Sequence, residues 1–112
     1  MREIKIKIYG RVQGVNFRVM TRDFCDENEI KGNVMNSDDG SVLVVAQADD
    51  DRLRKLIEWA KSSPGFSRVD DVRVVKCEIA RKYKDFGIIR EDSFFRDQKN
   101  SFRNLGKSFG RN

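Results

Sequence analysis

Hydrophobic and polar residues alternate strictly at the start of the chain. Ile4, Ile6 and Ile8 are separated by polar residues, and this two-residue period is typical of a β-strand with one buried face. Further along, the apolar spacing changes to three and four residues, which predicts a helix over residues 17–29. Gly32 is expected to end that helix.

The middle of the chain has the pattern of a β-hairpin followed by a second helix. Residues 32–36 (GNVMN) and 41–48 (SVLVVAQA) flank a short Asp-Gly turn, which is typical of two strands joined by a short connection. Three successive aspartates at 49–51 favour a helix N-terminus, and the apolar residues after them keep a helical spacing as far as Ala60. The Ser-Ser-Pro-Gly sequence at 62–65 should end this helix.

Two β-rich segments complete the pattern. Residues 69–79 are rich in valine, and their apolar phase changes between Val74 and Val75, which we attribute to a β-bulge. Residues 86–90 are expected to form a short last strand. The order of elements predicts an α+β fold, a ferredoxin-like split βαβ sandwich with an antiparallel four- to five-stranded sheet and two helices on one face. In this fold the first and third strands are neighbours, and the second lies next to the third.

Chain length and a change in composition separate one domain from a tail. The chain has 112 residues, enough for a single hydrophobic core, and we assign the domain to residues 1–90. Residues 91–112 form a basic C-terminal tail with interspersed phenylalanines. We expect this tail to be mobile or loosely docked, and the alternatives are docking of its phenylalanines onto the domain or a neighbour, or contact with nucleic acid.

The composition narrows the classes of function and location. The net charge is +5 with both signs mixed along the chain, which favours phosphorylated or otherwise anionic partners only weakly. We do not expect a nucleic-acid partner, because the predicted strands display almost no aromatic residues for base stacking. The chain lacks the long apolar runs of membrane spans and signal peptides, which predicts a cytoplasmic protein without a membrane partner, in which Cys25 and Cys77 are reduced. Histidine is absent, which excludes Ser-His and Cys-His nucleophile pairs, and two cysteines cannot complete a zinc site. We therefore expect no metal and no cofactor.

The candidate site lies where the first strand meets the first helix. Residues 10–18 read GRVQGVNFR, and the two glycines inside this sequence permit a tight turn that directs successive N–H groups inward. Arg18 stands on the opening turn of the helix, where its planar guanidinium and the positive end of the helix dipole both attract anions. The stretch predicts an anion cradle, in particular for phosphate. The alternative is a turn that only reverses the chain, followed by a solvated arginine.

Asn36 is the second candidate, at the end of the strand over 32–36. The predicted strand order brings this end toward the cradle, so that the amide of Asn36 could face it. The alternative is a turn-forming asparagine, which is common before an Asp-Asp-Gly sequence.

At these residues the chain resembles the acylphosphatase family. GRVQGVNFR is similar to the first signature of that family, and GNVMNSDDGSV, residues 32–42, is similar to the second. Further similarity at 63–69 and 86–90 extends the resemblance over about the first 90 residues.

Three residues depart from the pattern of the family. Asn33 stands where an aromatic residue is common, and Asn28 and Glu29 replace the usual apolar residue and glycine. These departures concern packing and the end of the first helix rather than the candidate site.

The resemblance implies metal-independent hydrolysis of the carboxyl-phosphate bond of acyl phosphates to a carboxylate and inorganic phosphate. It implies that Arg18 and Asn36 are the catalytic residues, with Asn36 positioning the attacking water. It further implies that the phosphate is held by the loop over 12–17 together with Arg18. The implied phosphate-binding residues are Val12, Gln13, Gly14, Val15, Asn16, Phe17 and Arg18. No residue of the motifs is an obvious general base, and the phosphate oxygen of the substrate would accept the proton of the water.

Other interpretations remain open at this point. The chain could be an inactive acylphosphatase-like interaction module, or a ferredoxin-like module that binds RNA. It also resembles the amino-terminal domain of hydrogenase maturation proteins, which acts on carbamoyl phosphate. We prefer a free-standing enzyme whose partners are a small-molecule acyl phosphate and its inorganic phosphate product, and which is a monomer unless the tail mediates association.

Overall fold

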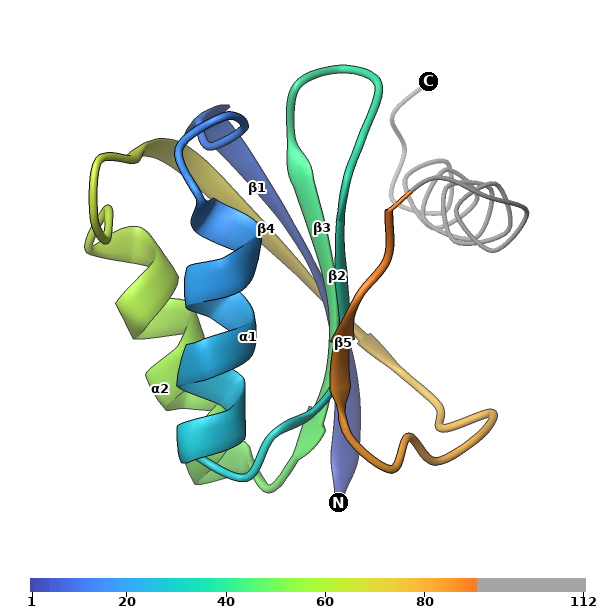
Figure 1. Cartoon of the computed structure of the whole chain (residues 1–112). Coiled ribbons are helices and arrows are strands. Elements are labelled where there is room, and N and C mark those ends of the chain that lie inside the picture. Colours follow the sequence, from blue (N-terminus) through green and yellow to red (C-terminus); the bar gives the residue numbers. More distant parts are fainter. Residues whose placement is uncertain (91–112) are drawn as a thin grey trace.

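The computed structural model describes residues 1–90, so the predictions for the tail over 91–112 lie outside the described residues. A sheet of five strands carries two helices on one of its faces (Figure 1). In chain order the elements are β1 (Arg2–Arg11), α1 (Phe17–Glu27), β2 (Lys31–Asn36), β3 (Val42–Ala48), α2 (Asp50–Lys61), β4 (Arg68–Cys77) and β5 (Phe86–Ile88). Neither helix of this part of the chain is long and apolar enough to span a membrane.

The strand order β4-β1-β3-β2-β5 confirms the predicted ferredoxin-like α+β fold, with one correction. The sheet is mixed, because β5 pairs in parallel with β2 while the other pairs are antiparallel. After β4 the chain crosses to the far edge of the sheet along the face away from the helices (Figure 1). Gln47 fixes this crossing, because its amide donates to the carbonyl of Arg81 at 2.7 Å and accepts from the N–H of Tyr83 at 3.1 Å.

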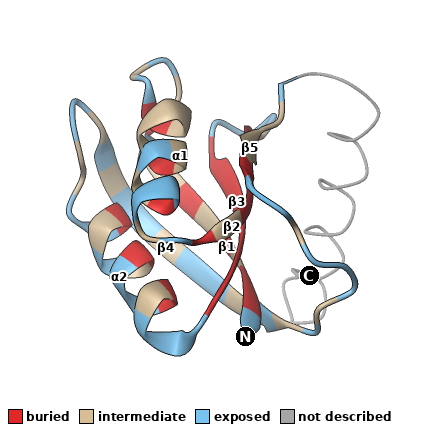
Figure 2. Ribbon diagram, turned by 60° about the horizontal axis from the view of Figure 1, so that its bottom comes forward, coloured by how far each residue is buried: buried red, intermediate tan, exposed pale blue. Residues whose placement is uncertain are grey.

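The core lies between the sheet and the helices, and it follows the predicted alternation. Ile4, Ile6 and Ile8 are at most 3% exposed and belong to one apolar cluster with residues of both helices. The central strand β3 is buried along its whole length, and Figure 2 shows buried residues concentrated on the central strands and on the inner sides of the helices. Burial on both faces explains why the sequence of β3 is almost continuously apolar.

The predicted β-bulge between Val74 and Val75 is wrong. The register between β1 and β4 runs unshifted through both valines, and the shift lies between Tyr9 and Gly10, where β4 contributes one extra residue, Asp70. The two valines point to opposite faces of an edge strand, where Val74 is 39% exposed and Val75 is half-buried. The change in apolar phase between Val74 and Val75 therefore arises because both faces of β4 are partly covered.

The end of α1 differs from the expected one. The helix stops at Glu27, and the chain reverses at Glu29, whose φ of 58° lies in the left-handed region. The N–H of Ile30 donates to the carbonyl of Cys25 at 2.8 Å, as in a Schellman motif with Glu29 at the position that usually holds glycine. Gly32 lies inside β2, where a Cβ atom would collide with the carbonyl oxygen of Val45. The glycine therefore permits the close approach of β2 to β3 and does not end the helix.

The remaining boundaries agree with the sequence pattern or differ slightly. Asp49 caps α2, because its carboxylate accepts from the N–H of Arg52 at 2.9 Å. The last two strands end at Cys77 and Ile88, earlier than the predicted Ile79 and Arg90.

Replacing Glu29 with glycine should stabilise the domain. A left-handed conformation costs a residue with a Cβ about 1 kcal/mol, so we expect Glu29→Gly to raise the free energy of unfolding by about that amount, measured by chemical denaturation. Glu29→Ala is the matched control, because it removes the exposed Glu29–Arg52 ion pair but keeps the Cβ. A glycine variant no more stable than the alanine variant would contradict the prediction.

Candidate functional site

The pairing of β1 and β2 with β3 brings the C-terminal ends of β1 and β2 to the same end of the sheet. Ile8 of β1 pairs with Val42 of β3, and Val42 pairs in turn with Asn36 of β2. Side chains that share such a row point to the same face, and Ile8 and Val42 face the helices as part of the core. Asn36 therefore faces the side on which α1 begins.

The loop between β1 and α1 is folded as an open turn. Gly14 has a φ of 77° and Asn16 a φ of 66°, so two residues of the loop adopt left-handed conformations. The side chain of Asn16 does not cap α1, and the first turn carries no acidic residue. The first helical hydrogen bond runs from the N–H of Met20 to the carbonyl of Asn16 at 3.1 Å. The preceding N–H groups have no helical acceptor and are available to an anion.

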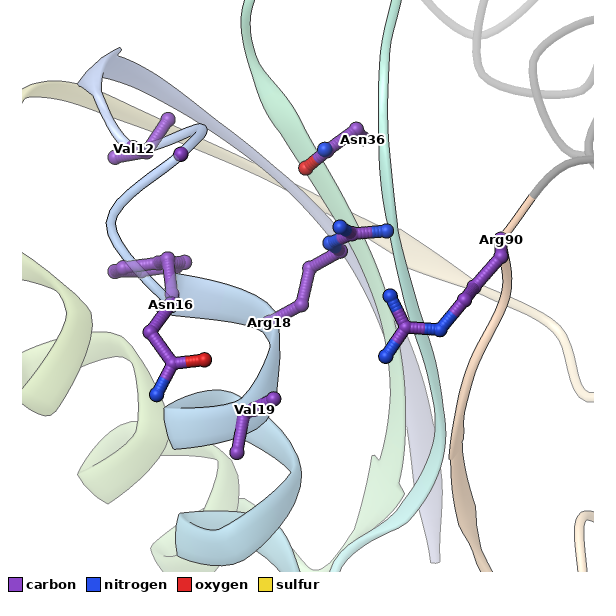
Figure 3. Close-up of a pocket in the computed structure, with 8 residues that line it drawn as sticks. Val12, Asn16, Arg18, Val19, Asn36 and Arg90 are labelled. Atoms are coloured by element: carbon purple, nitrogen blue, oxygen red, sulfur yellow. The ribbon is translucent and has the colours of Figure 1, made fainter.

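This loop, α1 and the ends of two strands enclose a pocket of about 180 Å³, which is smaller than the roughly 300–1,000 Å³ typical of sites for drug-sized ligands. Figure 3 shows the arrangement of its side chains. The lining residues are Val12, Gly14, Asn16, Phe17, Arg18, Val19, Asn36 and Arg90. Arg18 and Asn36, the two residues singled out as catalytic from the sequence, thus line one pocket.

Gln13 and Val15 of the predicted phosphate loop do not line this pocket. The amide of Gln13 instead donates to the carbonyl of Ser37 at 2.7 Å and to the carbonyl of Ser41 at 2.8 Å. Both acceptors belong to the turn that follows Asn36. Gln13 therefore ties the loop to the hairpin that carries Asn36, while Val15 packs against the core.

The turn after Asn36 is further held by Asp39. Its carboxylate accepts from the N–H of Ser41 at 3.0 Å and from the hydroxyl of Ser41 at 2.6 Å, and it lies 3.1 Å from the ammonium of Lys7. Burial alone would raise the pKa of Asp39, but the hydrogen bonds from Ser41 and the contact with Lys7 lower it to about 2. The carboxylate therefore stays ionised at neutral pH and keeps these bonds.

The pocket is positively charged. Arg18 and Arg90 line it and no carboxylate does, and neither guanidinium has an ion pair within residues 1–90. Burial lowers the pKa of Arg18, and the nearby charge of Arg90 lowers it further. The carboxamide oxygen of Asn36 is buried and has no hydrogen-bond partner among the described residues. The pocket thus combines two cations with an unused hydrogen-bond acceptor.

Other chemical groups in the described part of the chain do not gather at this site. No three carboxylates or cysteines within residues 1–90 lie close enough together to hold a metal ion. Cys25 and Cys77 are both free, and burial raises the pKa of the Cys25 thiol strongly.

Sequence reasoning missed two lining residues, Val19 and Arg90. Val19 could have been found, because the first three N–H groups of any helix that begins at Phe17 are unpaired. Arg90 belongs to the segment at 86–90 that resembles the family, but its place in the pocket follows from the parallel pairing of β5 with β2, which the sequence does not show.

Comparisons with known proteins agree with one another. A family model described as Acylphosphatase matches residues 4–88. An acylphosphatase of Oceanobacillus iheyensis is 44% identical over 75 residues, which cover 66% of this chain and 82% of the relative. An acylphosphatase of Thermotoga petrophila is 39% identical over 88 residues, or 79% of this chain and 97% of the relative. The crystal structure of acylphosphatase from Bacillus subtilis matches with a TM-score of 0.76 and 32% identity, covering 80% of this chain and 99% of that one. The chain belongs to the acylphosphatase family.

Proposed function

We propose that this chain is an acylphosphatase, which hydrolyses the carboxyl-phosphate bond of a small acyl phosphate to a carboxylate and inorganic phosphate without a metal cofactor. The observation that carries this proposal is the pocket in which the N-terminus of α1, Arg18 and Asn36 meet. Family membership over residues 4–88 supports the same activity.

The phosphate is bound by the loop and by Arg18. The unpaired N–H groups at the start of α1 and the backbone N–H groups of the loop residues that line the pocket, Val12, Gly14, Asn16 and Phe17, donate to the phosphoryl oxygens, and the guanidinium of Arg18 adds a charge-assisted pair of hydrogen bonds. Charge spreads over these oxygens in the transition state, so fixed donors stabilise it without reorganising. This role uses groups that have no competing partner within the domain.

Asn36 positions the attacking water. Its unpartnered carboxamide oxygen accepts a hydrogen bond from the water, which orients a lone pair of the water oxygen toward phosphorus, in line with the leaving carboxylate. The new P–O bond forms to the water, the bond between phosphorus and the acyl oxygen breaks, and the carboxylate departs with the bonding electrons. A phosphate oxygen of the substrate takes the proton of the water, since no lining residue is a base.

We further propose that the catalytic unit comprises residues 1–90, with 91–112 as an appended tail, and that the enzyme works as a monomer. Free cysteines in the described part of the chain support a reducing compartment, and we place the protein in the cytoplasm. An inactive interaction module remains the alternative, and an assay of turnover decides between the two.

Arg18→Ala should nearly abolish the hydrolysis of benzoyl phosphate, followed by ultraviolet absorbance. Loss of the charged donor should raise the activation free energy by about 3 kcal/mol or more, while EDTA should leave the wild-type rate unchanged. Arg22→Ala is the matched control, because Arg22 lies one turn further along α1 and pairs with Asp23 at 3.1 Å. Wild-type activity of the Arg18 variant would refute the assignment, and an inactive wild-type chain would favour the interaction module.

Asn36→Ala should lower kcat by about 100-fold, as expected for the loss of one positioned hydrogen-bonding group, while KM changes only a few-fold. The free energy of unfolding should fall little, because the oxygen that is removed has no partner within the described residues. Steady-state kinetics and chemical denaturation measure the two effects. A large rise in KM with kcat intact would mean that Asn36 binds the substrate.

Gln13→Ala should lower kcat by about tenfold, because it releases the Asn36 hairpin from the loop and misplaces the water relative to the phosphate. Asn28→Ala is a matched control, since it also removes an amide-to-carbonyl hydrogen bond, of 2.8 Å, at the other end of α1. Gln13→Glu, which cannot donate to the two carbonyls, should behave like the alanine variant. If kcat stays at the wild-type value and only stability falls, Gln13 has no positioning role.

A further inference from the structure

Arg90 is a cation of the pocket that the proposed mechanism does not use. The strand before it, β5, pairs in parallel with β2, with Ile88 opposite Val34, and the N–H of Ile89 donates to the carbonyl of Val34 at 2.8 Å. Two residues further along both segments, the same register sets Arg90 beside Asn36. Side chains two residues apart along a strand point to the same face, and Arg90 and Asn36 both line the pocket. Arg90 therefore flanks the residue that positions the attacking water.

No described residue balances the charge of Arg90. Within residues 1–90 neither Arg90 nor Arg18 forms an ion pair, and no carboxylate lines the pocket. Figure 3 shows the guanidinium of Arg90 directed across the pocket toward that of Arg18. Burial and the charge of Arg90 both lower the pKa of Arg18. An anion that lies between the two guanidinium groups relieves their repulsion, so the pocket favours a ligand with charge for both.

The in-line geometry of the proposed reaction decides which part of a substrate Arg90 meets. Water held by Asn36 attacks phosphorus from the Asn36 side, so the acyl group leaves from the opposite side. Arg90 lies beside Asn36 in the pocket and therefore faces the phosphoryl oxygens rather than the acyl group. These oxygens carry about two negative charges when the phosphate is fully ionised, which two arginines balance and one does not.

We propose that Arg90 is a second phosphate-binding residue, which shares the phosphoryl oxygens with Arg18 and makes the pocket select the dianionic form of phosphate over the monoanion. Arg18 reaches the phosphate from α1, and Arg90 reaches it from the segment that follows β5 (Figure 3). Inorganic phosphate, the second product, presents the same oxygens and should be held in the same way. The inference rests on the proposed function, but inorganic phosphate alone can test it without turnover.

Inorganic phosphate is a suitable probe because its charge changes with pH while its shape stays nearly the same. Calorimetry gives its dissociation constant for the full chain at about pH 5.5 and 8, where the monoanion and the dianion dominate in turn. No side chain that lines the pocket titrates in this range. We expect the wild type to bind the dianion more tightly. In Arg90→Gln the ratio of the two dissociation constants should fall about tenfold, the scale of one charge-assisted contact.

Two further variants separate direct contact from general effects of charge. Arg90→Lys keeps the cation and should keep most of the wild-type ratio. Arg22→Gln removes an arginine of α1 that pairs with Asp23 at 3.1 Å, and it should leave the ratio unchanged. A distorted pocket would weaken the binding of both ionic forms alike and would not move the ratio. A wild-type ratio in Arg90→Gln would therefore overturn the inference, even if both forms bind more weakly.

Inhibition kinetics distinguish failure of this inference from failure of the proposed activity. Phosphate at about pH 8 should compete with benzoyl phosphate, and Arg90→Gln should raise its inhibition constant about tenfold. If the wild type hydrolyses no acyl phosphate, the proposed activity fails. A preference for the dianion that Arg90→Gln reduces, together with loss of phosphate binding in Arg18→Ala, would still support the inference. Inhibition that is not competitive, or a wild type that binds no phosphate, would overturn it.

Discussion

The placement of the pocket depends on one row of paired residues across the sheet, in which Ile8, Val42 and Asn36 lie side by side on three strands. Ile8 and Val42 face the helices because they are buried in the core. Asn36 lies in the same row and must therefore face the helices as well. A slip of one residue in the pairing of β2 with β3 would turn Asn36 to the far side of the sheet. Hydrophobic burial thus sets the position of a polar side chain that itself contributes little to the core.

The loop after β1 is fixed in a complementary way. Its backbone follows from Gly14 and Asn16 in left-handed conformations, and its distance from β2 is held by the side chain of Gln13. The core thus positions the Asn36 side of the pocket, and the two hydrogen bonds of Gln13 hold the loop against it. A change at Gln13 can therefore alter the geometry of the pocket without weakening the hydrophobic core.

Much of this architecture could be predicted from the sequence, because local period and burial agree along β1, β3 and both helices. The juxtaposition of Arg18 and Asn36 followed from the expected strand order. What could not be predicted depends on long-range placement. Nothing in residues 86–90 indicates pairing in parallel with β2, and the position of Arg90 at the pocket follows from that pairing.

Errors in the sequence interpretation also have physical causes. A run of valines with mixed phase looked like a bulge because an edge strand is partly covered on both faces. Gly32 looked like a helix terminator, yet the chain reverses at Glu29, a residue that sequence preference does not favour there. The strain at Glu29 lies at the far end of α1 from the pocket, so its removal should leave the chemistry intact.

The residue types that line the pocket have a consequence for regulation by acidity. Two arginines, two asparagines, three apolar residues and a glycine line the pocket, and none of these side chains gains or loses a proton between about pH 5 and 8. The described residues that line the pocket therefore supply no protonation switch in that range. Under the proposed mechanism, the pH dependence of hydrolysis would follow the ionisation of the bound phosphate.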